Sequence, residues 1–263
     1  MTKRLLKQFA RPFRELLGRA IIIPPSRQLP IDWVANMGLM TKVAHFIASN
    51  KVDGDYLEFG VFRGNSFVES YRSIKRTFEE RIQSRSMEQN VTDEDARDRK
   101  RIWDNMRFFA FDSFKGLPEL RGVDLQTNEF AEGQYAAGID EFLRNVTSGG
   151  VPSEKIVCVP GWYEETCIPV TLEKHGLKKA SVVWVDCDLY HSAKRVLHFV
   201  TPLLQDGTII IFDDWYNYRG SPWRGEQRAF AEWRAADLQG FTLSEYQKQG
   251  PWQNSFVVSK IPA

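Results

Sequence analysis

The sequence has little cysteine, almost no net charge and no long apolar run. Its 263 residues include three cysteines, without a C-x-x-C pair, which argues against a disulfide framework and favours a reducing compartment. Lys and Arg number 35 and Asp and Glu 34, giving a net charge of +1. Proteins that bind nucleic acid typically have a clear excess of basic residues. No uncharged stretch reaches the roughly 18 residues of a membrane span. We therefore expect a cytoplasmic globular protein with no nucleic-acid partner and no membrane span.

The first 50 residues differ in pattern from the rest. Residues 3–19 place apolar side chains on one stripe with basic side chains around it, which predicts an amphipathic basic helix. No apolar signal region or cleavage site follows, so we expect no secretory leader. We interpret residues 1–50 as a helical extension that acts as a lid or as a contact in a homodimer. Attachment to an anionic membrane surface is the alternative.

From residue 51 onward, apolar runs that end in turn or acidic residues alternate with helical periodicity. This alternation predicts a mostly parallel α/β sheet with helices on both faces. A heavily charged segment at about residues 79–105 reads as a solvated insertion, and two runs around Gly250 and Pro251 predict a closing antiparallel hairpin. The expected strands are Tyr56–Gly60, Phe108–Asp112, Ile156–Pro160, Val182–Asp186, Thr208–Asp213, Phe241–Gln247 and Ser255–Ile261.

A glycine-containing loop follows the first expected strand. Gly60 and Gly64 can adopt positive φ and admit a ligand to the backbone at a helix N-terminus. The loop lacks the spacing of a dinucleotide fingerprint and the G-K-[ST] of a phosphate-binding loop. Glu58 would repel phosphate and suit a cationic ligand, and Asp112, at the end of the second strand, occupies the place of a ribose-binding acid. This combination points to S-adenosylmethionine (SAM), although an ordinary strand–helix turn is the simpler reading of the glycines.

Four acids follow two further strands. Asp186 and Asp188 end one strand, and Asp213 and Asp214 end the next. If these strands are neighbours, their carboxylates converge at the carboxyl edge, where open α/β sheets bind ligands. Two such charges about 4 Å apart repel by roughly 4 kcal/mol at an effective dielectric of 20, and all-oxygen ligation favours Mg²⁺ or another hard divalent cation. Helix capping could explain one or two of these acids, and His191 is a second choice of base.

The ordered motifs resemble the TylF/MycF-type (macrocin O-methyltransferase-like) class I SAM-dependent methyltransferases. The likeness covers residues 55–258, and its motifs are L-E-F-G-V-F-R-G-N-S from Leu57, F-D-S-F-K-G-L-P from Phe111, G-W-Y-E-E-T from Gly161, V-D-C-D-L-Y-H-S from Val185 and F-D-D-W from Phe212. It implies a Rossmann-like fold with a mostly parallel seven-stranded sheet in a SAM-binding domain spanning residues 51–263.

The same resemblance implies roles for individual residues. Asp186, Asp213 and Asp214 would be metal ligands, and Asp188 would be the catalytic base. The cofactor-binding residues would be Glu58, Gly60, Phe62, Gly64, Asp112, Ser113, Gly161, Trp162 and Asp186. Two departures are Cys187, where the family commonly has glycine, and His191, where it often has glutamate.

The resulting expectation is Mg²⁺-assisted methyl transfer from SAM to a hydroxyl of a small molecule, a sugar or a polyhydroxylated natural product. The alternatives are a SAM methyltransferase that acts on an amine, phenol or carboxylate without metal, and a non-catalytic SAM-binding protein.

Overall fold

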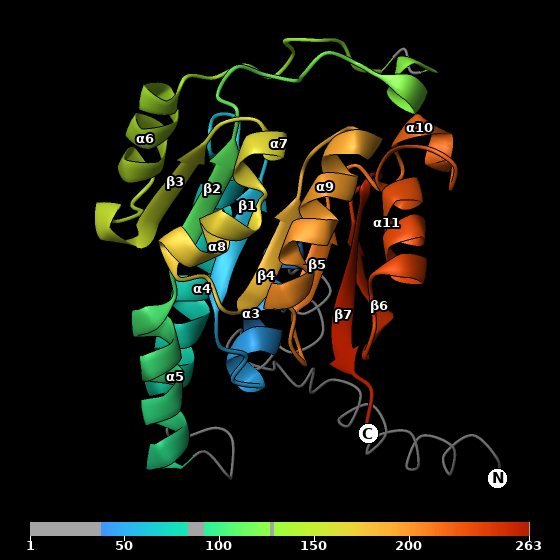
Figure 1. Cartoon of the computed structure of the whole chain (residues 1–263). Coiled ribbons are helices and arrows are strands. Elements are labelled where there is room, and N and C mark those ends of the chain that lie inside the picture. Colours follow the sequence, from blue (N-terminus) through green and yellow to red (C-terminus); the bar gives the residue numbers. More distant parts are fainter. Residues whose placement is uncertain (1–37, 84–91, 127–128, 263) are drawn as a thin grey trace, which may run out of the picture. The chain divides into compact units, whose positions relative to one another are not determined.

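The structure is a computed structural model that describes residues 38–83, 92–126 and 129–262. In this part of the chain, seven strands form one sheet in the order β3-β2-β1-β4-β5-β7-β6 (Figure 1). The first five pair in parallel, and β7 is antiparallel to β5 and β6. The expected sheet and closing hairpin are confirmed. The strands are β1 (Asp55–Phe59), β2 (Phe108–Asp112), β3 (Ile156–Pro160), β4 (Ala180–Val185), β5 (Ile209–Phe212), β6 (Phe241–Gln249) and β7 (Gln253–Lys260).

Helices cover both faces of the sheet. One buried apolar cluster joins α3, α4, α5 and α6 to one face, and a second joins α7, α8, α9 and α11 to the other (Figure 1). The helices are α3 (Leu39–Ser49), α4 (Asn65–Gln83), α5 (Asp93–Asn105), α6 (Ile139–Ser148), α7 (Tyr163–Thr166), α8 (Pro169–His175), α9 (Tyr190–Val200), α10 (Asn217–Gly220) and α11 (Gly225–Ala236), with short 3-10 turns η2 (Gly122–Gln126), η3 (Ser153–Lys155) and η4 (Thr201–Leu203).

The central strands β4 and β5 are almost wholly apolar because both of their faces are covered, whereas β1 also carries the buried acids Asp55 and Glu58. Every residue of β1, β4 and β5 is buried, as expected for parallel strands between two helical layers. Alternate residues of β1 enter different clusters: Leu57 and Phe59 contact the α9 side, whereas Tyr56 contacts the α4 side. Each such aliphatic or aromatic side chain contributes about 1.5–3 kcal/mol on burial. The alternation of side chains along the strands therefore determines which helical layer packs on each face of the sheet, and these layers support its carboxyl edge.

Two predicted segments lie partly outside the described residues. The basic helix expected at residues 3–19 is outside them, whereas α3, also within the expected extension 1–50, packs its apolar face into the same cluster as α4. In the charged segment, Thr92 and Asp95 form a capping box at the start of α5. Arg99 is buried and donates from Nε to the Ala48 carbonyl at 3.0 Å. This part of the charged segment is therefore a packed helix, and residues 84–91 lie outside the description.

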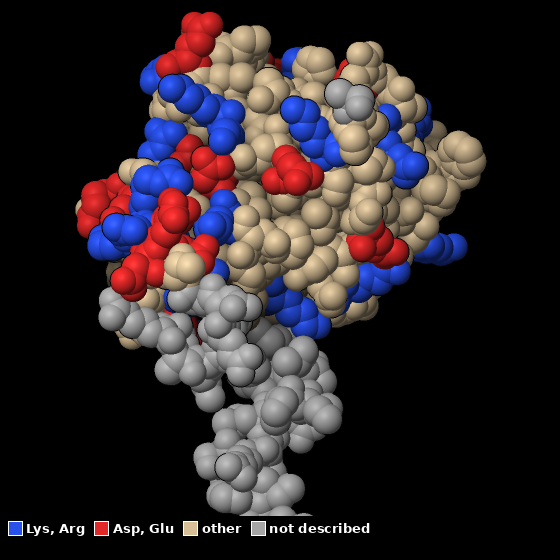
Figure 2. Space-filling view, turned by 90° about the horizontal axis from the view of Figure 1, so that it is seen from below, with Lys and Arg blue, Asp and Glu red and all other residues tan. Residues whose placement is uncertain are grey.

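The end of the molecule below the sheet carries mixed charge. On the face shown in Figure 2, Lys and Arg are interspersed with Asp and Glu. Ion pairs at the amino ends of the strands include Lys179 with Asp53 at 3.1 Å and Arg107 with Asp55 at 2.6 Å. Within the described ranges, no helix combines the length and apolar character needed to cross a membrane.

The parallel register aligns the ends of three strands. Phe59 of β1 pairs with Val185 of β4, and Val185 pairs with Phe212 of β5. The next residues along these strands are therefore neighbours at the carboxyl edge, which is where Gly60, Asp186 and Asp213 lie. Residues 113–126 run above this edge from β2 toward α10, and residues 129–138 return above it to α6; these residues are called the crossing segment (Figure 1).

Candidate active site

A cavity of about 280 Å³ opens at the carboxyl edge of the sheet. Its wall contains most of the residues that the sequence singled out. These are Gly60, Phe62, Asp112, Ser113, Gly161, Trp162, Asp186, Asp188, Asp213 and Asp214. Glu58, Gly64 and His191 are not part of the wall. The turns after β1, β2, β3, β4 and β5 thus contribute to one site, as expected for a ligand site of an open α/β sheet.

Gly60 is required by the close approach of two chain segments. Its φ is 92°, and a Cβ atom there would lie 1.8 Å from the carbonyl oxygen of Asp186. Any side chain would therefore push the β1 and β4 ends apart. Gly64, with φ of 86°, faces Val146 of α6 instead, where a Cβ would lie 2.4 Å from the Val146 Cγ1. Gly60 borders the cavity, while Gly64 permits helix packing.

Asp112 organises the glycine loop. One carboxylate oxygen, Oδ2, accepts hydrogen bonds from the backbone N–H groups of Val61 at 2.8 Å and Phe62 at 3.2 Å. The other oxygen accepts from the N–H of Phe114 at 2.7 Å. The side chain also lines the cavity. Asp112 therefore joins the turn after β2 to the loop after β1.

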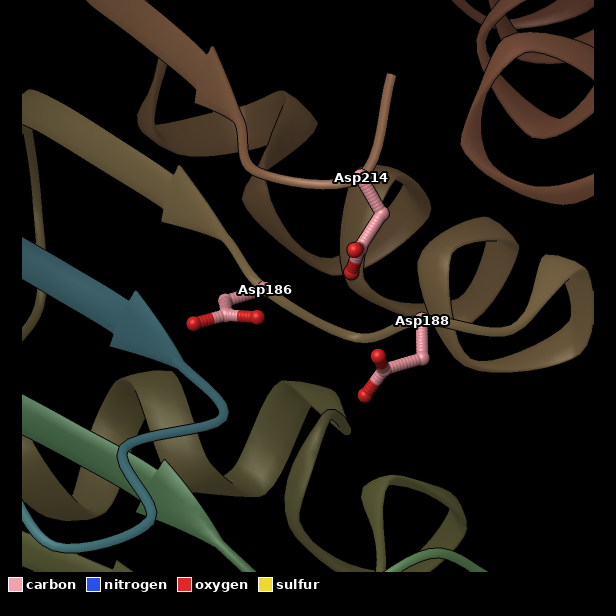
Figure 3. Close-up of side chains that lie close together, drawn as sticks. All are labelled: Asp186, Asp188 and Asp214. Carbon is pink, nitrogen blue, oxygen red and sulfur yellow. The ribbon is translucent and has the colours of Figure 1, made fainter. Parts of the chain in front are cut away.

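Three carboxylates from two neighbouring strand ends converge within the cavity. One oxygen from each of Asp186, Asp188 and Asp214 lies within 4.8 Å of the others (Figure 3). Asp214 accepts from the Asn217 side chain through Oδ1 at 2.6 Å, whereas its buried Oδ2 has no hydrogen-bond partner among the described residues. A buried oxygen without a donor is costly unless a ligand satisfies it. A cation or a proton held between the three carboxylates would satisfy the Asp214 oxygen.

Asp213, the third ligand that the resemblance implies, stands slightly apart. It lines the same cavity, but its Oδ1 accepts from Nε2 of Gln253 on β7 at 2.6 Å. The closing hairpin thus supplies a hydrogen-bond donor that holds this carboxylate. The group of three that the structure places together contains Asp188 where the resemblance implies Asp213.

Burial and mutual repulsion favour the protonated forms of these acids. Burial raises the pKa of Asp188 to about 7, and the charge of Asp213 adds to this effect. Burial raises the pKa of Asp186 well above its usual range, as do the charges of Asp213 and Asp214. Burial and the Asp188 charge act in the same way on the pKa of Asp214. Such shifts are typical of functional sites.

Glu226 supports the Asp214 turn from behind the cavity. It is 1 % exposed and lies in the first turn of α11, and its Oε2 accepts from the backbone N–H of Asp214 at 3.1 Å. Burial raises its pKa well above the usual range, and the neighbouring Asp214 adds to the shift. Nothing in the sequence marks Glu226 as part of the site, since a glutamate in a helical pattern is typical of an exposed face.

Glu58 lies beneath the glycine loop and is fully buried. Ser66 donates to its Oε1 at 2.6 Å, and the Tyr56 hydroxyl contacts its Oε2. Burial raises the pKa of Glu58 to about 8, although both hydroxyl contacts oppose that shift. Glu58 thus ties β1 to the first turn of α4.

This burial predicts a pH-dependent stability. Glu58 has an ordinary pKa of 4.5 and a folded-state pKa of about 8, so the folded protein holds the proton more tightly than the unfolded chain. The stabilisation is complete below about pH 4 and is lost as the pH rises toward 8. Between pH 5 and pH 8, we expect the Tm of the wild type to fall by about 10 °C more than the Tm of Glu58→Gln. This difference corresponds to about 3 kcal/mol in the free energy of unfolding.

Calorimetry of both proteins across this pH range measures the difference. Glu69→Gln, at an exposed position on α4, is the control and should follow the wild-type curve. Parallel curves for the wild type and Glu58→Gln would contradict the prediction.

His191 anchors the crossing segment. Its Nδ1 lies 2.6 Å from Oδ2 of Asp124, a residue of η2 that is 2 % exposed. Asp124 also accepts from the backbone N–H groups of Tyr190 at 2.9 Å and His191 at 3.2 Å, at the start of α9. The Nδ1 of His191 is therefore hydrogen-bonded to Asp124 of the crossing segment, and His191 is not part of the cavity wall.

The crossing segment also contributes residues that the sequence analysis did not select. Leu117, Pro118 and Tyr135 line the cavity. Leu117 and Pro118 lie in the D-S-F-x-G-L-P motif, which could have identified them. Tyr135 carries no such signal: it is 51 % exposed, has a φ of 57° and contacts Phe62 edge to face with ring centroids 5.9 Å apart.

The fold and the cavity together define a class I methyltransferase, and the comparisons agree. Residues 87–239 match the family model for macrocin-O-methyltransferase (TylF). This match covers more than half of the chain, which therefore belongs to the TylF family and is a SAM-dependent O-methyltransferase. No curated protein sequence is a significant match.

Solved structures share the fold at low sequence identity. CalS11, a calicheamicin methyltransferase, is 21 % identical with a TM-score of 0.60, covering 98 % of this chain and 94 % of that one. The O-methyltransferase NovP is 20 % identical with a TM-score of 0.57, covering 84 % and 78 %. An O-methyltransferase from Bacillus cereus in complex with SAH is 14 % identical with a TM-score of 0.51, covering 91 % and 94 %.

Proposed function

We propose that this protein transfers a methyl group from SAM to a hydroxyl of a sugar or of another polyhydroxylated small molecule, with the assistance of Mg²⁺ or a similar cation. The observation that carries the proposal is one cavity that contains both the glycine-loop residues and the convergent carboxylates of Asp186, Asp188 and Asp214. Cofactor and acceptor must meet in such a space for direct transfer, because proximity and orientation supply much of the rate.

The donor set fits a hard divalent cation. All candidate ligand atoms are carboxylate oxygens, which Mg²⁺ and Mn²⁺ prefer over softer ligands, and the buried Oδ2 of Asp214 has no partner in the described chain. We assign Asp186, Asp213 and Asp214 as the residues that would hold the cation. When bound, a divalent cation would lower the pKa of a hydroxyl in its coordination sphere.

Asp188 is the proposed proton acceptor. Its carboxylate lies beside Asp186 and Asp214 in the cavity (Figure 3), so it can reach a hydroxyl held there. Its burial favours uptake of a proton. His191 is the weaker candidate, since Asp124 occupies its Nδ1.

The remaining cavity residues would hold the cofactor. SAM brings its own activated methyl group, so the protein's part is to position it. Gly60 and Phe62 border the proposed methionine end, Asp112 the ribose, and Ser113, Gly161 and Trp162 the adenine. All six line the cavity. Glu58 supports this loop from below through Ser66, which suggests an indirect contribution to cofactor binding.

The acceptor class is supported by the relatives. One CalS11 structure is described as a TDP-rhamnose 3'-O-methyltransferase (20 % identical, TM-score 0.50), and the family model carries the name of macrocin O-methylation. We therefore propose a sugar hydroxyl here. An amine, phenol or carboxylate acceptor without metal is the second candidate. The homodimer, the cytoplasmic location and the division of the chain at residue 50 stay predictions.

Transfer of a labelled methyl group tests the proposal. The full chain is incubated with methyl-labelled SAM and, in separate reactions, with glycosides, nucleotide-linked sugars, a catechol, a phenol, an amine and a carboxylate, each with and without Mg²⁺. We expect label in an O-methyl sugar and a rate that rises with Mg²⁺. Label found only in the amine, phenol or carboxylate reactions, at a rate independent of Mg²⁺, would favour the second candidate.

A further inference from the structure

Tyr218 bridges three segments above the sheet. Its side chain is 5 % exposed, and its hydroxyl donates to the backbone carbonyl of Asp188 at 2.7 Å. Its backbone N–H donates to Oε2 of Glu129 at 2.9 Å, and its ring lies 5.7 Å from that of Phe130. The segment after β5, the turn after β4 and the crossing segment are thus joined through one residue.

The carbonyl that Tyr218 binds belongs to a residue in an unusual backbone conformation. Asp188 has a φ of 58°, in the left-handed region that residues with a Cβ atom rarely adopt. Such a conformation persists only where neighbouring contacts hold it. The backbone dihedrals of Asp188 orient its Cα–Cβ bond relative to the flanking peptides, and its carboxylate lies close to those of Asp186 and Asp214 (Figure 3).

The ring of Tyr218 packs closely against Gly225 and a small apolar cluster. Tyr218 and the next residue, Arg219, also have left-handed φ values of 57° and 59°. At Gly225, a Cβ atom would lie 2.4 Å from the ring carbon Cε2 of Tyr218. Leu117 and Leu189 complete a small apolar cluster with Phe130 and Tyr218. The left-handed backbone at Tyr218 and the missing side chain at Gly225 together allow the Tyr218 hydroxyl to reach the Asp188 carbonyl. Burial of the ring in an apolar cluster would not by itself require this hydrogen bond.

We propose that Tyr218 is a positioning residue for methyl transfer, because its hydroxyl holds the Asp188 backbone in the conformation that directs the carboxylate into the cavity. The inference rests on the proposed function, in which Asp188 accepts the proton of the acceptor hydroxyl. A residue with a purely structural role would affect stability and leave the turnover of the folded enzyme unchanged.

Tyr218→Phe tests this role, since it keeps the ring in place and removes only the hydroxyl. Tyr246→Phe is the matched control: the Tyr246 hydroxyl also donates to a backbone carbonyl, that of Lys42 at 3.2 Å, outside the cavity wall. We expect Tyr218→Phe to lower kcat by about 10- to 100-fold, as a small misplacement of a reacting group does. The acceptor KM and the SAM Kd should stay within twofold, and Tm should fall no further than in Tyr246→Phe.

A crystal structure of Tyr218→Phe separates this inference from the proposed function. We expect Asp188 to leave the left-handed conformation or its carboxylate to turn away from Asp186 and Asp214. An unchanged Asp188 in that structure, or equal kcat values for Tyr218→Phe and Tyr246→Phe, would overturn the positioning role. If Asp188→Asn itself were fully active, the proposed function would fail, while the conformation of Asp188 in the variant would still report whether Tyr218 holds it.

Discussion

Asp188→Asn is expected to lower kcat by about 10²- to 10⁴-fold, the usual contribution of a general base, while SAM binds within twofold of its wild-type affinity. Asparagine has nearly the same shape and can adopt the same left-handed backbone, so the hydrogen bond from Tyr218 to the residue 188 carbonyl can persist. The amide cannot accept a proton from the acceptor. Steady-state kinetics with labelled SAM and calorimetric titration of SAM measure the two quantities.

Binding of Mn²⁺ distinguishes a base from a ligand at this position. Because an oxygen of Asp188 lies with those of Asp186 and Asp214, the same turnover defect would follow from loss of a metal ligand. A base predicts unchanged Mn²⁺ affinity in Asp188→Asn and weakened affinity in Asp213→Asn. The reverse pattern would reassign the two residues. Asp104→Asn, at an exposed position on α5, is the control for both measurements, and full turnover in Asp188→Asn would remove the base assignment.

The positions of the acids could be predicted from the sequence because strand ends are local signals. An apolar run followed by Asp186 and Asp188, and another followed by Asp213 and Asp214, is visible without any contact information. The parallel α/β pattern then requires neighbouring strand ends to share one edge. The register of β4 on β5, in which Val185 pairs with Phe212, places these acids side by side. For Gly60 the sequence predicts a loop that admits a ligand, whereas the close approach of the Asp186 carbonyl is visible only in the structure.

The hydrogen bonds that refine the site could not be predicted in this way. Asp124 and His191 are 67 positions apart, and Tyr218 and Asp188 are 30 apart. Their pairing depends on how the crossing segment runs above the sheet, which no periodicity encodes. The sequence therefore makes His191 a second candidate base, whereas in the structure its Nδ1 binds Asp124. Glu58 shows the same limit, because its burial under Tyr56 and Ser66 follows from tertiary packing.

The negative charges of the clustered acids repel one another, and hydrogen bonds from the protein offset this repulsion only in part. Gln253 donates to Asp213, Asn217 donates to Asp214, and the Asp214 backbone N–H bonds Glu226. No lysine or arginine is among the described residues that line the cavity. The remaining charge must be met by protons, which the raised pKa values of Asp186 and Asp214 permit, or by a bound cation. These two solutions give opposite expectations when divalent ions are removed.

Removal of divalent cations is accordingly expected to lower kcat by roughly 10²- to 10³-fold, because cation assistance of this kind contributes several kcal/mol to a reaction that generates an oxyanion. The full chain is dialysed against EDTA, returned to metal-free buffer and assayed with labelled SAM. Mg²⁺ and Mn²⁺ should each restore turnover, since the donor atoms are carboxylate oxygens that both ions accept. Titration of SAM into the dialysed protein confirms that the fold and the cofactor site survive the treatment.

Asp214→Asn is the matched variant for this experiment. Its amide can keep the hydrogen-bonding position near Asn217 but loses the negative charge at the atom that has no partner. The variant should turn over at about the rate of the dialysed wild type and gain little from added Mg²⁺. If protons alone neutralise the acids, the dialysed wild type will retain its full rate and Mg²⁺ will not change it. That result would leave Asp186 and Asp214 as a proton-sharing pair and would exclude the proposed role of the cation.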